Sequence, residues 1–250
     1  MIVDLRHDTV GLDGYEVQEG VPGRISIVPD PTGRNRLVGR YDIHAGDPLV
    51  KIAKRTETTT EDIIPLTFET PHWYTGEFLL PDDGKIWNEL STAPFQFHDV
   101  ADEDDVKRAP TLLGRIFAPD DTLVVYTGYD DPPTDPTTVD PDRTEVARIK
   151  LRRGRWYHWR LEVSWAYTAN GYQRFYLDGH LLYSFTGINT YQDAIPPHAK
   201  QGNYLYGEWA NEIHTSRTVY QAGFLIGVGE DYEALYGPRR QAGAAVTVMG

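Results

Sequence analysis

The clearest indication of the fold lies in residues 156–165, Trp156-Tyr157-His158-Trp159-Arg160-Leu161-Glu162-Val163-Ser164-Trp165. Large apolar side chains occupy every second position from Tyr157 to Trp165, and polar side chains lie between them. This period of two predicts a β-strand with one buried face. A second alternating run covers 219–228, where Tyr220, Phe224 and Ile226 are expected to share a face.

A hairpin signal follows the first strand. Asp178-Gly179 separates two strand-like runs, 172–177 and 181–185. Both central residues of a type I′ turn need positive φ, and Asp-Gly supplies them readily. The sequence therefore predicts two antiparallel strands joined by a tight turn.

Shorter strand-like runs recur along the chain from about residue 24, with Gly, Pro and Asp at the turns and almost no helical periodicity. They cover 24–28, 37–44, 73–80, 112–117, 123–126 and 146–151. This pattern predicts an all-β fold, a two-sheet antiparallel sandwich or jelly roll. We expect one domain over 1–236, with its core in about 24–230, and a C-terminal tail at 237–250.

The charge and composition exclude several classes of protein. A net charge of −13 argues against nucleic-acid binding, and an acidic glycan would need a local basic patch. There is no cysteine, so disulfides and thiolate zinc sites are excluded. No apolar run is long enough to span a membrane, and the first residues show no secretory signal, so the localisation stays open.

Acidic residues gather in two segments, 102–105 and 130–142. The prolines of 130–142 cannot donate hydrogen bonds to a sheet, so we expect a long surface loop there. The carboxylates of both segments could hold calcium, but their spacing matches no rigid calcium loop, so a solvated acidic loop is the favoured interpretation. We expect no required cofactor and leave calcium open.

The segment 94–99 carries the first chemical groups. On a strand, Gln96 and His98 share one face, and Phe95 and Phe97 anchor the other. An amide beside an imidazole suits a uronic acid, since the amide can disperse the carboxylate charge and the imidazole can move a proton. The alternative is an ordinary polar surface or a satisfied core histidine.

Two further segments, 54–57 and 202–209, also carry chemical groups. Tyr204 and Tyr206 share one strand face, and a tyrosine can act as both base and acid in an elimination. Both tyrosines are equally plausible as cross-strand packing residues.

The order of these segments resembles that of one family, and the likeness spans about 24–230. The resemblance is to the polysaccharide lyases of the heparin lyase I, glucuronan lyase and alginate lyase type. It rests on the following segments, in order: Arg40 to Asp47, Arg55-Thr56-Glu57, Trp73 to Asp83, Gln96-Phe97-His98, Gly154 to Trp159, Tyr176 to His180 and Gly202 to Tyr206.

This resemblance implies a concanavalin-A-like β-jelly roll whose concave sheet holds a sugar chain. It implies that Gln96 neutralises the substrate carboxylate, that His98 assists proton removal and that Arg55 positions the acid group. Aligning the family's Tyr-Phe-Lys-x-Gly-x-Tyr motif places its lysine at Tyr206 and its last tyrosine at Trp209 or Ala210, which leaves Tyr206 as the candidate acid and base. The residues expected to bind substrate are Glu57, Trp73, Asn203, Tyr204 and Trp209.

Three functions stay open from the sequence. The first is β-elimination of a glycan that contains uronic acid. The second is non-catalytic glycan binding through exposed aromatic rings, for which the candidates are Trp73, Trp87, Tyr191 and Trp209. The third is a bacteriophage virion component, of the tail or associated with the capsid, that binds glycan or assembles as a homo-oligomer.

Overall fold

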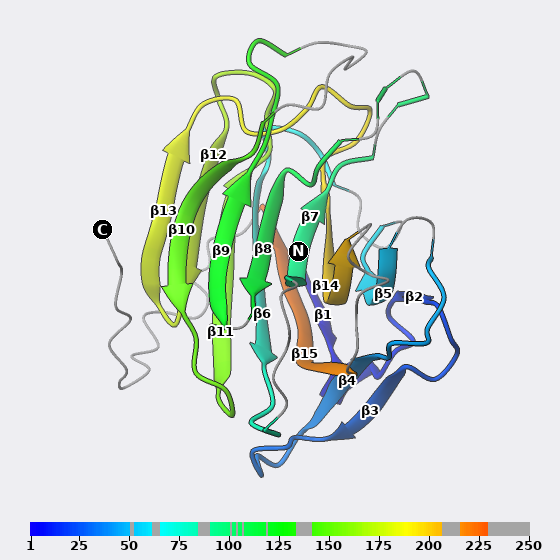
Figure 1. The fold of residues 1–250 in the computed structure, drawn as a ribbon. Coiled ribbons are helices and arrows are strands. Elements are labelled where there is room, and N and C mark those ends of the chain that lie inside the picture. The colour runs from blue at the N-terminus through cyan, green and yellow to red at the C-terminus, as the bar shows by residue number, and fades with distance from the viewer. Residues whose placement is uncertain are drawn as a thin grey trace.

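Two antiparallel β-sheets pack against each other in the computed structural model (Figure 1). The structure describes residues 1–50, 53–61, 66–84, 91–100, 102–103, 105–106, 108–118, 120–133, 142–206 and 216–229. Within these residues the one helix is the short α1 (His7–Val10). No helix among them is both long and apolar enough to cross a lipid bilayer.

The first sheet follows the spatial order β13-β12-β11-β6-β15-β4-β3, and β1 pairs with β15 beside this path. Its strands are β1 (Ile2–Arg6), β3 (Ile25–Pro29), β4 (Leu37–Ile43), β6 (Pro71–Leu79), β11 (Trp156–Ser164), β12 (Tyr172–Leu177), β13 (His180–Thr186) and β15 (Arg217–Val228).

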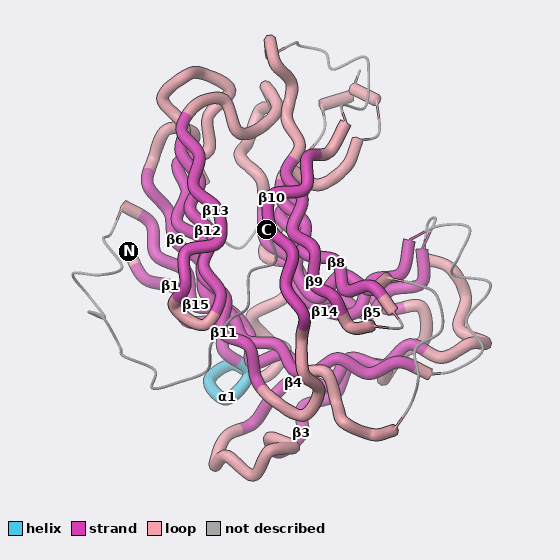
Figure 2. The backbone as a smooth tube through the Cα atoms, turned by 60° about the vertical axis from the view of Figure 1, so that its left-hand side comes forward, coloured by secondary structure: helices cyan, strands magenta, loops and turns pink. Residues whose placement is uncertain are grey.

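The second sheet follows the order β10-β9-β8-β7-β14-β5-β2. Its strands are β2 (Glu16–Glu19), β5 (Ala53–Thr59), β7 (Thr92–His98), β8 (Leu112–Phe117), β9 (Thr122–Thr127), β10 (Thr144–Lys150) and β14 (His198–Tyr206). Figure 2 shows the two sheets as separate layers, with β12 and β13 in one and β8 to β10 in the other. The predicted all-β sandwich is therefore confirmed.

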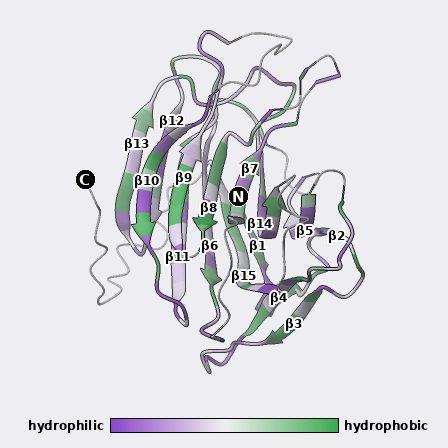
Figure 3. Ribbon diagram, viewed as in Figure 1, coloured by the Kyte–Doolittle hydropathy of each residue, from purple (hydrophilic) through white to green (hydrophobic). Residues whose placement is uncertain are grey.

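An aromatic core joins the two sheets. Trp159 of the first sheet stacks on Phe95 of the second, with 5.1 Å between ring centroids, and Phe97 meets Tyr74 edge-on at 4.9 Å. These four side chains are at most 1% exposed. Figure 3 shows hydrophobic residues on the strands of both sheets. Burial of these rings is the main favourable term for this fold.

The predicted hairpin is present between β12 and β13. Asp178 has a φ of 49° and Gly179 a φ of 80°, as a type I′ turn requires. The alternation expected for 219–228 holds only in part, because the register of β15 against β6 shifts between Gln221 and Phe224. As a result Val219, and not Tyr220, joins Phe224 in the main core.

Two strands lie before residue 24, where no strand was predicted. β1 pairs with β15, and the amino group of Met1 donates to Val228 O at 2.9 Å. β2 pairs with β5, and its short, mostly polar sequence gave no alternation to detect. The predicted tail at 237–250 and residues 134–141 of the predicted loop lie outside the described residues.

Candidate functional site

Strand β14 brings the chemical segments together. It pairs with β5 on one side and with β7 on the other. The register places Tyr204 opposite Arg55, Lys200 opposite Gln96, and His198 opposite His98. Directly opposed residues share a face of a sheet. Because Phe95 and Phe97 fill the core, this set lies on the face turned away from the core.

Gln96 is held by a carboxylate. Its Nε2 donates to Glu57 Oε1 at 2.6 Å, and the two residues are 3% and 1% exposed. Glu57 Oε2 lies 3.6 Å from Arg55 Nη1, which also donates to Gln18 Oε1 of β2 at 3.3 Å. Glu57, expected to bind substrate, therefore orients Gln96 and Arg55 from a buried position.

Tyr204 lies beside Arg55, whose guanidinium carbon is 4.9 Å from the centre of the tyrosine ring. The spacing Lys-x-Gly-x-Tyr occurs in β14 as Lys200-Gln201-Gly202-Asn203-Tyr204. A Cβ on Gly202 would approach Thr56 O to 2.2 Å, so the β5 backbone requires glycine there. The family's spacing therefore also fits Lys200 to Tyr204, and the alignment with its lysine at Tyr206 stays a prediction, because the Tyr206 side chain lies outside the described residues.

His98 is partly exposed, with 35% of its side chain accessible. Its Nδ1 lies 2.9 Å from the backbone oxygen of Asp99. A carbonyl only accepts, so Nδ1 carries the hydrogen and Nε2 is the nitrogen that can accept a proton in the neutral ring.

His198 supports His98 from the neighbouring strand. The two rings are stacked, with 6.2 Å between centroids and 23° between planes. His198 is 4% exposed, and burial, with smaller contributions from the charges of Lys200 and His98, lowers its pKa to about 3. His198 is therefore a neutral ring behind His98 at neutral pH.

The same face carries positive charge, although the chain as a whole is acidic. Lys200 is 7% exposed and lies opposite Gln96. Arg55 lies on β5, the strand on the other side of β14 from Gln96. Arg115 of β8 shares this face, since Leu113 lies opposite Gln96 and Arg115 follows two positions later. These three cations lie on the same face as the Glu57 carboxylate and form a local basic cluster among the described residues.

Several expected site residues do not lie on this face. Asn203 is fully buried, and its Nδ2 donates to Tyr41 O at 3.3 Å and to Arg217 O at 3.1 Å. The expectation of exposed rings at Trp73 and Tyr191 is wrong, since they are 1% and 0% exposed. Trp73 packs against Gly227, and the Tyr191 hydroxyl donates to Ala109 O.

Other expected residues cannot be placed. Tyr206 pairs through its backbone with Ala53, but its side chain lies outside the described residues. Trp87 and Trp209 are also outside them.

Three residues of this site were not predicted from the sequence: Lys200, His198 and Gln18. The signal for the first two was present in the period of two from His198 to Tyr204, which continues the face that Tyr204 defines. Gln18 had no comparable signal, because β2 was not predicted.

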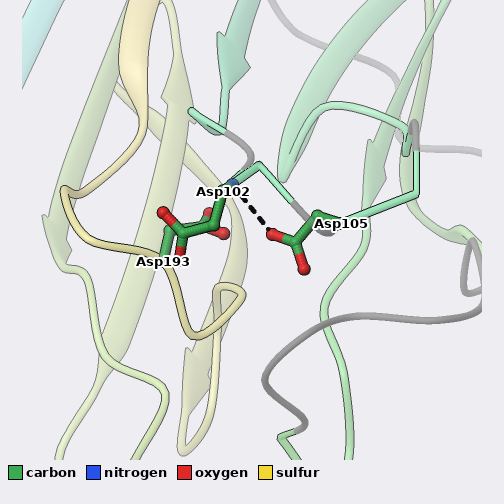
Figure 4. Close-up of side chains that lie close together, drawn as sticks. All are labelled: Asp102, Asp105 and Asp193. Carbon is green, nitrogen blue, oxygen red and sulfur yellow. Dashed lines mark hydrogen bonds between the residues drawn. The ribbon is translucent and has the colours of Figure 1, made fainter.

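Carboxylates gather beyond the end of β7. Asp102, Asp105 and Asp193 each present an oxygen within 4.8 Å of the others (Figure 4). Among the described residues these three form the group best suited to a metal ion.

A family model described as polysaccharide lyase matches residues 7–223. A search of the curated protein sequences found no match.

Three solved structures show the same fold at low sequence identity. Endo-β-1,4-glucuronan lyase from the fungus Trichoderma reesei has a TM-score of 0.68 at 16% identity, over 91% of this chain and 94% of that chain. Alginate lyase vAL-1 from Chlorella virus has a TM-score of 0.55 at 10% identity, over 90% and 99%. Alginate lyase PA1167 from Pseudomonas aeruginosa has a TM-score of 0.52 at 13% identity, over 89% of each chain.

The family match and these structures give no support to a role as a bacteriophage virion component.

Proposed function

Because this chain belongs to the polysaccharide lyase family, we propose that it cleaves a polymer of uronic acid by β-elimination. The reaction would take place on the outer face of β5, β7 and β14. One observation carries the proposal: Gln96, His98, Lys200 and Tyr204 lie on one face of two adjacent strands, with Arg55 alongside on the third. Such a face combines a charge-neutralising group with two groups that can transfer protons.

The substrate carboxylate would be bound by Gln96 and Lys200. The C5 proton of a uronate is weakly acidic, and removing it places negative charge on the carboxylate. The Gln96 amide, oriented by Glu57, and the Lys200 ammonium would disperse that charge. Both side chains are nearly buried, so a carboxylate that reaches them leaves most of its water behind and is bound more strongly.

Two groups would move the protons. His98 Nε2 or the Tyr204 phenolate would accept the C5 proton, the C4–O4 bond would break as the C4–C5 double bond forms, and the Tyr204 hydroxyl would protonate O4. Arg55 lies against the Tyr204 ring, and its positive charge would favour the phenolate that serves as the base.

The test is an ultraviolet assay of the full-length chain with a panel of polyuronides. Glucuronan comes first, because a structure with the same fold is a glucuronan lyase. Alginate and heparin complete the panel. The C4–C5 double bond absorbs in the ultraviolet, so absorbance should rise with at least one polymer. Gln96→Ala and Lys200→Ala should each lower the rate by roughly 10²-fold or more.

A second measurement separates catalysis from binding alone. Each polymer is titrated against the wild-type chain in a binding assay. Binding to one of them with no rise in absorbance on any would overturn the lyase proposal and would favour the non-catalytic glycan-binding function.

A further inference from the structure

Arg115 of β8 lies beside the proposed site of reaction but on a strand that the mechanism does not use. Leu113 lies opposite Gln96, so Arg115, two positions further along β8, is a diagonal neighbour of Gln96 on the same face. Diagonal neighbours in a sheet are about 7–8 Å apart, a distance that long side chains can span. Arg115 can therefore reach the same substrate chain as Gln96.

The guanidinium of Arg115 is held away from Gln96. Its Nε and Nη2 donate to Ser91 Oγ at 3.1 and 2.7 Å, and its central carbon lies 5.2 Å from the centre of the Phe117 ring. Ser91 comes five residues before Gln96, and Phe117 comes two residues after Arg115. Because β7 and β8 are antiparallel, both contacts draw the guanidinium toward the start of β7. A carboxylate bound there belongs to a different sugar from the one at Gln96.

The row of residues that contains Tyr204 leads across the sheet to Arg115. Tyr204 lies opposite Arg55 on one side and opposite Ala93 of β7 on the other. Ala93 lies within the register shift of β7 against β8, where the facing position on β8 is that of Arg115. One row across β5, β14, β7 and β8 therefore contains, in order, Arg55, Tyr204, Ala93 and Arg115. Between the tyrosine and Arg115, Ala93 contributes only a methyl group.

We propose that Arg115 binds the carboxylate of the sugar on the far side of the bond that is broken. The inference rests on the proposed function, in which Gln96 and Lys200 bind the carboxylate of the sugar that loses its C5 proton. Tyr204 would protonate O4, the oxygen that joins this sugar to the next one. The next sugar would then lie over the row that leads from Tyr204 to Arg115. A guanidinium has several N–H donors and can bind Ser91 and a carboxylate at the same time.

This contact would determine which polymers are preferred. A polymer made only of uronic acid presents a carboxylate on both sides of the broken bond. A polymer in which uronic acid alternates with a neutral sugar presents one on the Gln96 side alone. The contact with Arg115 would therefore favour the first class of polymer over the second.

Arg148 of β10 offers a matched control on the same face. Val124 of β9 lies opposite Arg115 on one side and opposite Arg148 on the other. Arg148 Nε and Nη2 donate to the Glu145 carboxylate at 2.8 and 2.7 Å. Since a carboxylate of its own strand already neutralises Arg148, we expect it to contribute nothing to substrate binding.

The experiment measures binding to the full-length Tyr204→Phe chain, which should bind polymers without cleaving them. Two unsulfated polymers are titrated by calorimetry: glucuronan, in which every sugar is a uronate, and heparosan, in which glucuronate alternates with N-acetylglucosamine. Adding Arg115→Ala should weaken glucuronan binding by roughly 10-fold or more, because a hydrogen-bonded charge pair is lost, and should change heparosan binding by about 2-fold at most. Arg115→Lys should restore part of the loss, and Arg148→Ala should bind both polymers like the parent chain.

Ultraviolet assays of the wild type, run in parallel, allow the two proposals to fail separately. A wild type that cleaves no polyuronide, with the binding pattern above intact, would reject the lyase function and retain Arg115 as a carboxylate contact. Glucuronan binding that Arg115→Ala leaves unchanged, or no binding of glucuronan at all, would overturn the role of Arg115. Equal weakening on both polymers together with a lower thermal midpoint would also overturn it, since Arg115 would then only hold β8 to Ser91.

Discussion

Gln96 Nε2 donates to Glu57 Oε1 over 2.6 Å, and this bond passes across the strand that separates the two residues. Gln96 lies on β7 and Glu57 on β5, with β14 between them. Glu57 is opposite Gly202, which has no side chain to stand in the way. The glycine that the β5 backbone requires therefore also lets two long polar side chains meet above β14.

Replacing Glu57 with alanine should destabilise the fold. The change leaves the buried amide of Gln96 and the guanidinium of Arg55 without their carboxylate, and a lost bond to a charged group costs about 1.5–3 kcal/mol. Glu57→Gln keeps an acceptor and should cost less. The free energy of unfolding, from urea titration, measures both. Glu16→Ala, at an exposed position on β2, is the control and should stay within about 0.5 kcal/mol of the wild type.

The proposed reaction makes Tyr204 the decisive tyrosine. Tyr204→Phe keeps the ring against Arg55 and removes the hydroxyl, so the thermal midpoint should hardly change while turnover of a uronate polymer falls by roughly 10²-fold or more. The rate of ultraviolet absorbance change under saturating substrate measures the loss.

Tyr206→Phe is the matched variant, two residues along the same strand. It should keep most of the wild-type rate. The opposite result, with Tyr206→Phe inactive and Tyr204→Phe active, would overturn the role proposed for Tyr204 and make Tyr206 the acid and base.

Local patterns predicted the parts of the fold that depend on neighbouring residues. The alternation over 156–165 located β11, and Asp178-Gly179 located the turn between β12 and β13, since both signals are set by a few adjacent side chains. The same period of two placed Gln96 and His98 opposite Phe95 and Phe97, and the core confirms the buried side of that strand.

Features that depend on distant segments could not be predicted. The bond between Gln96 and Glu57 needs the order of three strands, and the carboxylate cluster needs Asp193 to reach a segment some 90 residues earlier. The register shift within β15 reverses which residues face the core, and no local sequence pattern predicts that shift. Sequence alternation fixes the face of a residue on a regular strand, but not which strands are neighbours.

A buried asparagine should be essential for the stability of the first sheet. Asn189 Nδ2 donates to Ser164 O at 3.0 Å and to Tyr172 O at 2.9 Å, and Asn189 Oδ1 accepts from Ala166 N at 2.9 Å. Asn189→Ala would remove these three hydrogen bonds from the buried backbone. A typical hydrogen bond contributes about 0.5–1.5 kcal/mol, so we expect a loss of about 1.5–4.5 kcal/mol, measured by urea unfolding.

Asn170→Ala is the control for this variant. Asn170 is exposed, and among the described contacts its side chain makes one long hydrogen bond, 3.5 Å, to Glu69 Oε1. Its loss should stay within about 0.5 kcal/mol. An equal loss of unfolding free energy in both variants would show that the three Asn189 hydrogen bonds stabilise the protein no more than the exposed Asn170 contact does.

Buried histidines should make the protein unstable in mild acid. Burial lowers the pKa of His7 and of His72 to about 4 and that of His198 to about 3. In the unfolded chain each titrates near 6.5, so below that pH the unfolded chain binds protons that the folded chain excludes. Asp193 opposes this, since its pKa of about 7 lets the folded chain bind a proton from pH 7 down to about 4.

Between pH 6.5 and 4 the unfolded chain binds protons at three histidines that stay neutral in the fold, and the folded chain binds one at Asp193. The unfolded chain therefore carries the net excess of protons. Stability should be highest near pH 6.5 and should fall steadily as the pH drops to about 4, by about 1.4 kcal/mol per pH unit for each uncompensated proton. Urea unfolding at pH 7.5, 6.0 and 5.0 measures this slope. His72→Phe removes one buried titrating ring and should flatten the slope, whereas His180→Gln at an exposed position should leave it unchanged. A stability that stays constant or rises between pH 6.5 and 5 would mean that these rings are protonated within the fold, which their burial opposes.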